Sequence, residues 1–138
     1  MPPTPIPVFR VLPLALVAFG LWGQPPAAAH PGASGDAAPV TITIDDHLRF
    51  SPNVITIKPG TRVRWVNGSV LRHTVTADPA KAARGRDVAL PKGAQPFDSG
   101  YIDPKGTYEH RFTVAGHYRY FCIPHESTGM VADIIVKE

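Results

Sequence analysis

The chain has 138 residues, of which 43% are apolar and 18% are charged. This length predicts one compact domain, and the apolar content suffices for one core, so a wholly disordered chain is excluded. The formal net charge of +3 is mild. Because no stripe of basic and aromatic residues accompanies it, no nucleic-acid partner is expected.

Residues 1–29 have the pattern of an export signal. Arg10 is the only charged side chain among the first 35 residues, and an apolar run follows it at 11–23. Three alanines at 27–29 then form an A-x-A cleavage pattern, so we expect a signal peptide cut after Ala29 and an exported protein, periplasmic or otherwise extracytoplasmic. The alternative is an uncleaved membrane anchor. The run is shorter than the about 20 residues of a transmembrane helix, so no stable membrane insertion is expected after cleavage.

Residues 30–39 are rich in Ala, Gly and Pro, which predicts a flexible mature N-terminus ahead of a folded domain at 40–138. At 40–45, Val and Ile alternate with Thr and Asp, with the period of two that is typical of a half-buried strand. Similar short segments follow, separated by turns that contain Pro and Gly. We expect strands at 40–45, from 54 onward, and at 62–67, 73–76, 97–101, 107–112, 116–121 and 131–136.

About eight short strands with a turn every 8–12 residues or so predict an all-β sandwich or barrel. At 62–67, Val63, Trp65 and Asn67 fall on the opposite face from Arg64 and Val66. We expect the 50–53 segment between the first two strands to be a turn.

Residues 79–96 lack alternation, so we expect a short helical or loop insertion there, with Asp78 capping a helical turn that runs through Ala83. This insertion is basic. A solvated loop is the favoured interpretation, and a docking patch for an acidic partner is the alternative. The basic residues are Lys81, Arg84, Arg86 and Lys92.

Cys122 is the only cysteine, so the chain can form no internal disulfide. An unpaired thiol in an oxidising compartment is a liability unless it is buried or bound to a metal. Cys122, His125 and Met130 follow the pattern C-x2-H-x4-M on a loop between two predicted strands, and His73 begins another strand earlier in the chain. A thiolate, two imidazoles and a weak axial thioether are the ligands of a blue-copper electron-transfer site.

Each of these residues, taken alone, has a simpler interpretation. Cys122 alone would be a small buried hydrophobe, Met130 alone a core residue and His125 alone a surface residue. Zinc is the main metal rival, but methionine is a poor zinc ligand and structural zinc sites use several cysteines. The remaining histidines compete with His73 for a role, and we take them as surface or partly buried residues. They are His47, His110 and His117. His30 would become the mature N-terminus, a position that can bind copper weakly, and we take it as incidental.

From about Val40 to Glu138 the chain resembles the plastocyanin/pseudoazurin branch of the cupredoxins, the blue-copper proteins. The block from Tyr120 to Val131, which contains the C-x2-H-x4-M pattern, carries the resemblance together with Asn67 and His73 upstream. It implies a Greek-key β-sandwich. It also implies one copper ion, bound strongly by His73, Cys122 and His125 and weakly by Met130.

One departure concerns the residue after the first histidine. Many family members have asparagine there, where it ties this loop to the cysteine loop, and this chain has Thr74. Because a threonine hydroxyl also forms hydrogen bonds, we expect the tie to persist with altered strength.

The resemblance implies a soluble electron-transfer protein rather than an enzyme, with a type 1 copper site that cycles between Cu(II) and Cu(I). Its partners would be redox proteins such as cytochromes or copper enzymes, which dock transiently on an apolar patch around His125. An exported copper carrier or storage protein is the alternative. Carriers expose methionine- or histidine-rich clusters, whereas Met130 is the only methionine besides the initiator.

Overall fold

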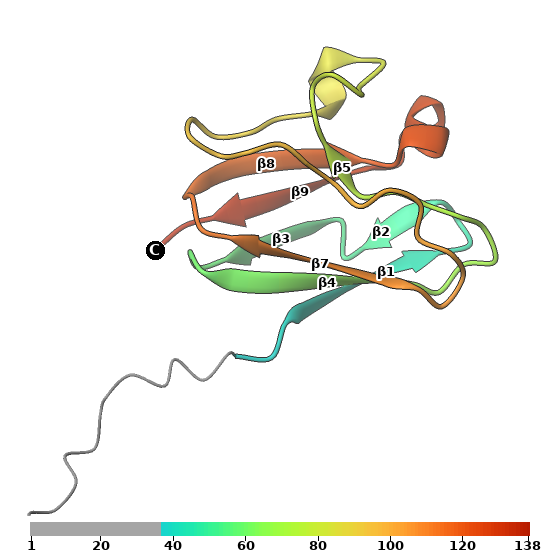
Figure 1. Ribbon diagram of the computed structural model, residues 1–138, viewed down its shortest axis with the longest axis horizontal. Coiled ribbons are helices and arrows are strands. Elements are labelled where there is room, and N and C mark those ends of the chain that lie inside the picture. The colour runs from blue at the N-terminus through green and yellow to red at the C-terminus, as the bar shows by residue number, and fades with distance from the viewer. Residues whose placement is uncertain (1–36) are drawn as a thin grey trace, which may run out of the picture. The chain divides into compact units, whose positions relative to one another are not determined.

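The computed structural model describes residues 37–138 (Figure 1). The predicted signal peptide, its cleavage after Ala29 and residues 30–36 of the predicted flexible segment at 30–39 lie outside the described residues. Within the described part, none of the helices has the length and apolarity that crossing a membrane requires.

Two sheets pack face to face, as the all-β sandwich prediction required (Figure 1). The first sheet has the order β2-β1-β4-β7, and the second has the order β3-β9-β8-β5-β6. Both sheets are mixed, because β1 pairs with β4 and β3 pairs with β9 in parallel, while the other pairings are antiparallel. The strands are β1 (Val40–Asp45), β2 (Arg49–Ser51), β3 (Val54–Ile57), β4 (Thr61–Asn67), β5 (Thr76–Ala77), β6 (Phe97–Asp98), β7 (Thr107–Phe112), β8 (Gly116–Phe121) and β9 (Val131–Val136).

Alternation in sequence sets which side chains face the core. On β4, Val63, Trp65 and Asn67 are all fully buried, as predicted, and in the register with β1 Trp65 lies opposite Ile42. Trp65 also donates its indole N–H to the hydroxyl of Tyr120 on β8 at 3.1 Å, which joins the two sheets across the core. A buried Trp N–H that finds an acceptor avoids the cost of an unsatisfied donor.

Three local predictions differ from the structure. Residues 49–51 form β2 rather than part of a turn, because they pair with β1 as a hairpin. The strand predicted at 73–76 is wrong for its first three residues: His73 forms only an isolated bridge with Ile102, and β5 begins at Thr76. The strand predicted at 97–101 is shorter than expected, because β6 ends at Asp98. The chain therefore has nine strands in its described part.

The 79–96 segment is the loop with a short helical turn that the sequence predicts, but the helix lies elsewhere in it. Asp78 caps a turn rather than a helix, since its carboxylate accepts the N–H of Ala80 at 3.0 Å. The 3-10 helix η1 is Gly85–Asp87. Beyond it, Ala89 forms a two-way backbone bridge with Arg119, which attaches the segment to β8.

Candidate metal centre

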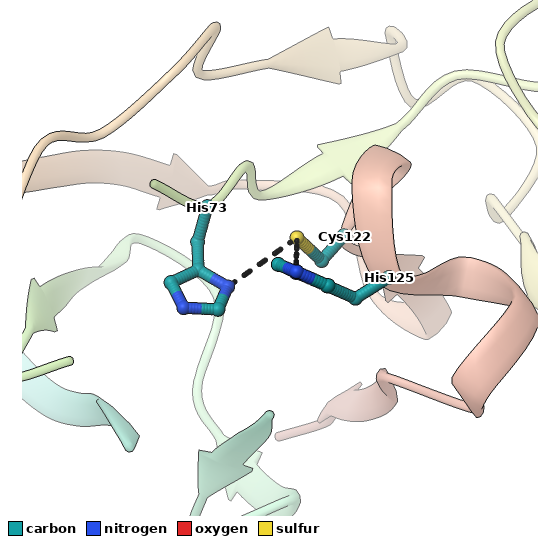
Figure 2. Close-up of side chains that lie close together, drawn as sticks. All are labelled: His73, Cys122 and His125. Atoms are coloured by element: carbon teal, nitrogen blue, oxygen red, sulfur yellow. Dashed lines mark hydrogen bonds between the residues drawn. The ribbon is translucent and has the colours of Figure 1, made fainter. Parts of the chain in front are cut away.

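His73, Cys122 and His125 meet at one end of the sandwich, and their ligand atoms all lie within 4.8 Å of one another (Figure 2). The Cys122 sulfur lies 3.6 Å from Nδ1 of His73 and 3.4 Å from Nδ1 of His125. The first two side chains are fully buried, whereas His125 is half-buried. Both imidazoles therefore present the same ring nitrogen to the thiol, and only His125 reaches toward solvent.

His73 is fixed through both its backbone and its ring. Its N–H donates to the carbonyl of Ile102 at 3.2 Å, and its carbonyl accepts the N–H of Ile102 at 2.7 Å. Its Nε2 lies 3.1 Å from the hydroxyl of Ser69, so a neutral ring with the proton on Nε2 leaves the Nδ1 lone pair facing the thiol. Burial, and then the neighbouring His125, lower the pKa of His73. The ring is thus held neutral, as a metal ligand must be.

Asn67 organises the loop that precedes His73. Its side-chain N–H groups donate to the carbonyls of Leu71 at 2.8 Å and Ile102 at 3.0 Å, and its carbonyl oxygen accepts the N–H of Ser69 at 3.0 Å. A fully buried amide with its hydrogen bonds satisfied holds the surrounding backbone in one arrangement. Hydrogen bonds from Asn67 therefore connect the end of β4 to the loop that carries His73.

The Cys122 thiol occupies a dry site that favours a metal. Its sulfur accepts the N–H of Thr74 at 3.3 Å. Burial raises the pKa of Cys122, against the opposing effect of hydrogen bonds from Thr74 and His125. Because a buried thiolate is costly without a positive partner, binding a cation between the sulfur and the two imidazoles would favour the deprotonated form.

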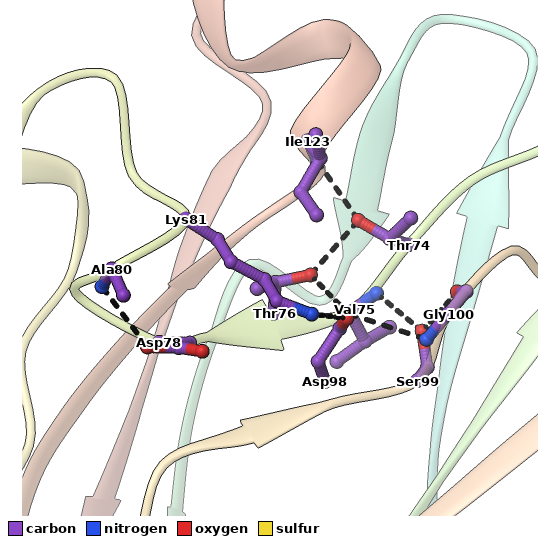
Figure 3. A network of polar contacts seen from close by, with 10 residues as sticks. All are labelled: Thr74, Val75, Thr76, Asp78, Ala80, Lys81, Asp98, Ser99, Gly100 and Ile123. Atoms are coloured by element: carbon purple, nitrogen blue, oxygen red, sulfur yellow. Dashed lines mark hydrogen bonds and ion pairs between the residues drawn. The ribbon is translucent and has the colours of Figure 1, made fainter.

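Thr74 connects the His73 loop to the cysteine loop, as predicted for the residue that follows the first histidine. Its hydroxyl accepts the N–H of Ile123 at 2.8 Å and lies 3.0 Å from the hydroxyl of Thr76 (Figure 3). Thr76 in turn bonds to a carboxylate oxygen of Asp98 at 2.8 Å, and Lys81 pairs with the same carboxylate. A chain of polar groups thus runs from the cysteine loop to the 79–96 segment.

The ligand loop is closed by its own backbone. It includes a 3-10 helix, η2 (Ile123–Thr128), which the sequence did not predict. The N–H of His125 donates to the carbonyl of Cys122 at 3.1 Å, and the N–H of Met130 donates to the carbonyl of His125 at 3.2 Å. The N–H of Cys122 donates to the carbonyl of Met130 at 3.1 Å. Gly129 ends the helix with φ of 84°, a left-handed conformation that favours glycine.

Met130 lies at the end of this loop with its side chain 1% exposed. The three residues whose ligand atoms converge are the two histidines and Cys122. Met130 is held beside them through backbone bonds to His125 and Cys122.

The remaining histidines of the described part lie outside this cluster, as expected. His110 stacks on Phe97 with ring centroids 4.2 Å apart, and His117 pairs with Asp133 at 2.6 Å. His47 is exposed. His30 lies outside the described residues.

Two of the four basic residues of the 79–96 segment form close ion pairs within the fold. Lys81 pairs with Asp98, and Arg84 Nε pairs with Asp87 at 2.7 Å. Arg86 is 75% exposed and lies 3.9 Å from Asp87, so the choice between a solvated loop and a docking patch for an acidic partner stays a prediction.

Sequence reasoning missed Glu126, which is only 4% exposed although it is charged and follows His125 directly. Its two carboxylate oxygens accept the N–H groups of Ala83 and Arg84, each at 2.9 Å. No local pattern marks this residue, because its partners lie more than 40 positions earlier in the chain.

One buried cysteine sulfur and two imidazole nitrogens fit copper better than zinc, whose structural sites use several cysteines. His73, Cys122 and His125 can hold one copper ion. The sandwich fold and this donor set define the class of small copper-binding β proteins.

Comparison with known proteins places the chain in the same class. Residues 37–137 match the family of copper binding proteins described as plastocyanin/azurin. The chain belongs to this family.

Two relatives share most of their length with this chain. It is 34% identical over 109 residues to plastocyanin from Nostoc punctiforme, with 78% of each chain covered. It is 31% identical to the solved structure of amicyanin from Paracoccus versutus, covering 73% of this chain and 83% of that one, with a TM-score of 0.56.

A third similarity is to part of a larger protein. The chain is 28% identical to the solved structure of a copper-containing nitrite reductase from Thermus scotoductus, with a TM-score of 0.58. That match covers 73% of this chain but 23% of the reductase.

Proposed function

We propose that this protein is a soluble carrier of single electrons with one type 1 copper ion. The observation that carries the proposal is the convergence of a buried thiol and two Nδ1 atoms at the end of a plastocyanin-like sandwich. Bound copper supplies the Cu(II)/Cu(I) couple, for which a mixed sulfur and nitrogen ligand set suits both oxidation states. Its relatives plastocyanin and amicyanin support this role.

In this proposal His73, Cys122 and His125 bind copper strongly, and Met130 is the weak axial ligand. The burial of Met130 and its backbone bonds to both loop ligands support that assignment. The hydrogen-bonded loop and the N–H of Thr74 on the sulfur hold these donors in place before the metal arrives. Little rearrangement then accompanies a change of oxidation state, which keeps electron transfer fast.

We assign docking to the surface around His125. It is the half-buried ligand, and exposed apolar side chains lie on its own loop and on the loop that leads to His73. They are Val70 at 78%, Leu71 at 46% and Ile123 at 37% exposure. A small apolar patch suits brief contact with redox proteins such as cytochromes or copper enzymes, since weak redox encounters bury less than about 1,200 Å².

Two other functions are less well supported. A copper carrier or storage protein needs ready exchange, whereas two of the three converging donors are fully buried. An enzyme such as a nitrite reductase needs a further catalytic copper centre, and the described residues hold one cluster of potential metal ligands. The similarity to the reductase covers 23% of that chain, which fits a shared electron-carrying domain.

The visible spectrum of the copper-loaded protein tests the proposal. We expect an intense blue or green absorption that Cys122→Ser abolishes, because a serine oxygen cannot replace the thiolate. His117→Gln is the matched control, since His117 lies outside the cluster and should leave the colour unchanged. Blue colour in Cys122→Ser would refute the site.

Two further measurements test whether Met130 is the axial ligand and whether the protein is instead a copper carrier. Met130→Leu should retain copper and shift the reduction potential, and loss of the metal there would contradict a weak axial ligand. Slow release of copper to a chelator favours electron transfer, while rapid handover would favour a carrier.

We also propose export with cleavage after Ala29, on the basis of the leader pattern. Mass spectrometry of the protein recovered from outside the cytoplasm tests the cleavage. An intact Met1 would overturn it.

A further inference from the structure

The 79–96 segment is fastened to the ligand loop at Glu126. The carboxylate accepts the N–H groups of two successive residues, Ala83 and Arg84, and the Arg84 guanidinium donates to the Glu126 carbonyl. Three contacts therefore join residues 83–84 to the position immediately after His125.

This carboxylate is an unusual group to find at 4% exposure. A buried charge is costly unless hydrogen bonds compensate for the lost water, and two aligned N–H groups at 2.9 Å provide that compensation. Both groups are neutral amides. The guanidinium of Arg84 is directed to the Glu126 carbonyl and to Asp87 rather than to the Glu126 carboxylate.

We propose that Glu126 is a positioning residue for the metal site, which holds the His125 loop against the 79–96 segment and lowers the reduction potential of the bound copper. The second half of this statement rests on the proposed function, because it concerns a copper ion held by His73, Cys122 and His125. The first half concerns the metal-free chain.

The sign of the effect follows from charge. A negative group near the ion stabilises Cu(II) relative to Cu(I), because Cu(II) carries the larger positive charge, and so it lowers the potential. Consecutive Cα atoms lie about 3.8 Å apart, so the Glu126 carboxylate and the metal-binding nitrogen of His125 cannot be more than about 12 Å apart. A unit charge at that distance in a medium of effective dielectric about 20 changes such an equilibrium about tenfold.

Glu126→Gln removes the charge and keeps the size. Its amide oxygen can accept one of the two N–H groups, while its NH₂ group faces the other, so the fastening weakens. We expect amide hydrogen exchange at Ala83 and Arg84 in the metal-free protein to quicken. In the copper-loaded protein we expect a higher reduction potential, by about tenfold in the Cu(II)/Cu(I) equilibrium, or about 59 mV for one electron.

Two variants complete the experiment. Glu126→Asp keeps the charge but is one methylene shorter, so it should quicken exchange at the two amides with a smaller shift of the potential. This variant also tests the proposal if Glu126→Gln fails to fold. Glu109→Gln is the matched control. Glu109 lies on β7 and pairs with Arg62 and Arg64 on β4, within the four-stranded sheet. Removing its charge should leave both the amide exchange and the reduction potential unchanged.

The outcomes are separable. Unchanged amide exchange in Glu126→Gln would overturn the fastening, and faster exchange with an unchanged potential would overturn the effect on copper. A shift in Glu109→Gln as large as that in Glu126→Gln would also overturn it, since distance to the site would then not matter. If the wild-type protein takes up no copper, the proposed function fails, and exchange in the metal-free protein still decides the fastening.

Discussion

Replacing Thr74 by valine removes one hydroxyl from the connection between the two ligand loops while keeping the side chain's shape. In the native protein this hydroxyl accepts the N–H of Ile123 at 2.8 Å and lies 3.0 Å from that of Thr76 (Figure 3). Because Thr76 donates to the ionised Asp98, its oxygen is left to accept the Thr74 proton. Thr74→Val therefore deletes two hydrogen bonds and leaves the Ile123 N–H without its acceptor.

The expected loss of stability follows from these two bonds. A part-buried N–H without its acceptor costs about 1–3 kcal/mol, and Thr76 keeps its bond to Asp98. We therefore expect the free energy of unfolding of the metal-free protein to fall by about 1–3 kcal/mol. In a domain of this size each kcal/mol lowers Tm by about 4–8 °C. Copper affinity should fall about 10–100-fold, as it does when groups that orient metal ligands are removed.

Urea denaturation of the metal-free protein measures the first effect, and competition with a copper chelator measures the second. Thr74→Ser is the control, because it retains the hydroxyl and should stay close to the wild type. Wild-type stability in Thr74→Val would refute the idea that this hydroxyl joins the loops.

Two further predictions concern the body of the sandwich and the attachment of the 79–96 segment. Burial lowers the pKa of His110 below its ordinary value of 6.5, so the unfolded chain binds the proton first as the pH falls. The stabilisation from a neutral His110 is then complete above about pH 6.5 and declines below it. His110→Phe should flatten the pH dependence of urea denaturation between about pH 7.5 and 5, and an unchanged profile would contradict this reasoning. Gly116 has φ of 139°, and a Cβ there would lie 2.4 Å from Cβ of Pro91. Gly116→Ala should therefore destabilise the protein by more than about 1 kcal/mol in the same assay, and a neutral effect would show that Pro91 can move away.

The sequence alone predicted the bounds of the six-residue strands. The strand predicted at 131–136 coincides with β9, whose side chains alternate between buried and half-buried positions, and the strands predicted at 107–112 and 116–121 coincide with β7 and β8. This reasoning could not predict β2 or the absence of a strand at 73–75. Their conformations depend on the partners β1 and Ile102, which no local pattern reveals.

In the metal centre, too, some residues could be predicted from local sequence and others depend on distant segments. Cys122 and His125 could be predicted from their spacing on one loop, since a short loop keeps its residues close. His73 came from resemblance, and its convergence with the other two depends on the pairing of distant backbone segments. The burial of Glu126 could not be predicted, because a glutamate in a polar loop is ordinarily solvated and only the packing of residues 83–84 changes that.

The aromatic core gives the protein an internal optical probe. Trp22 falls within the predicted signal peptide, so Trp65 would be the single tryptophan of the mature chain. It is fully shielded from solvent, with its ring centroid 5.5 Å from that of Tyr120, which lies two residues before the thiol. Its emission should be blue-shifted in the native protein and should move to longer wavelength on unfolding. Titrating copper into the metal-free protein should quench the same signal, so one fluorimeter trace can follow both folding and metal uptake without any label.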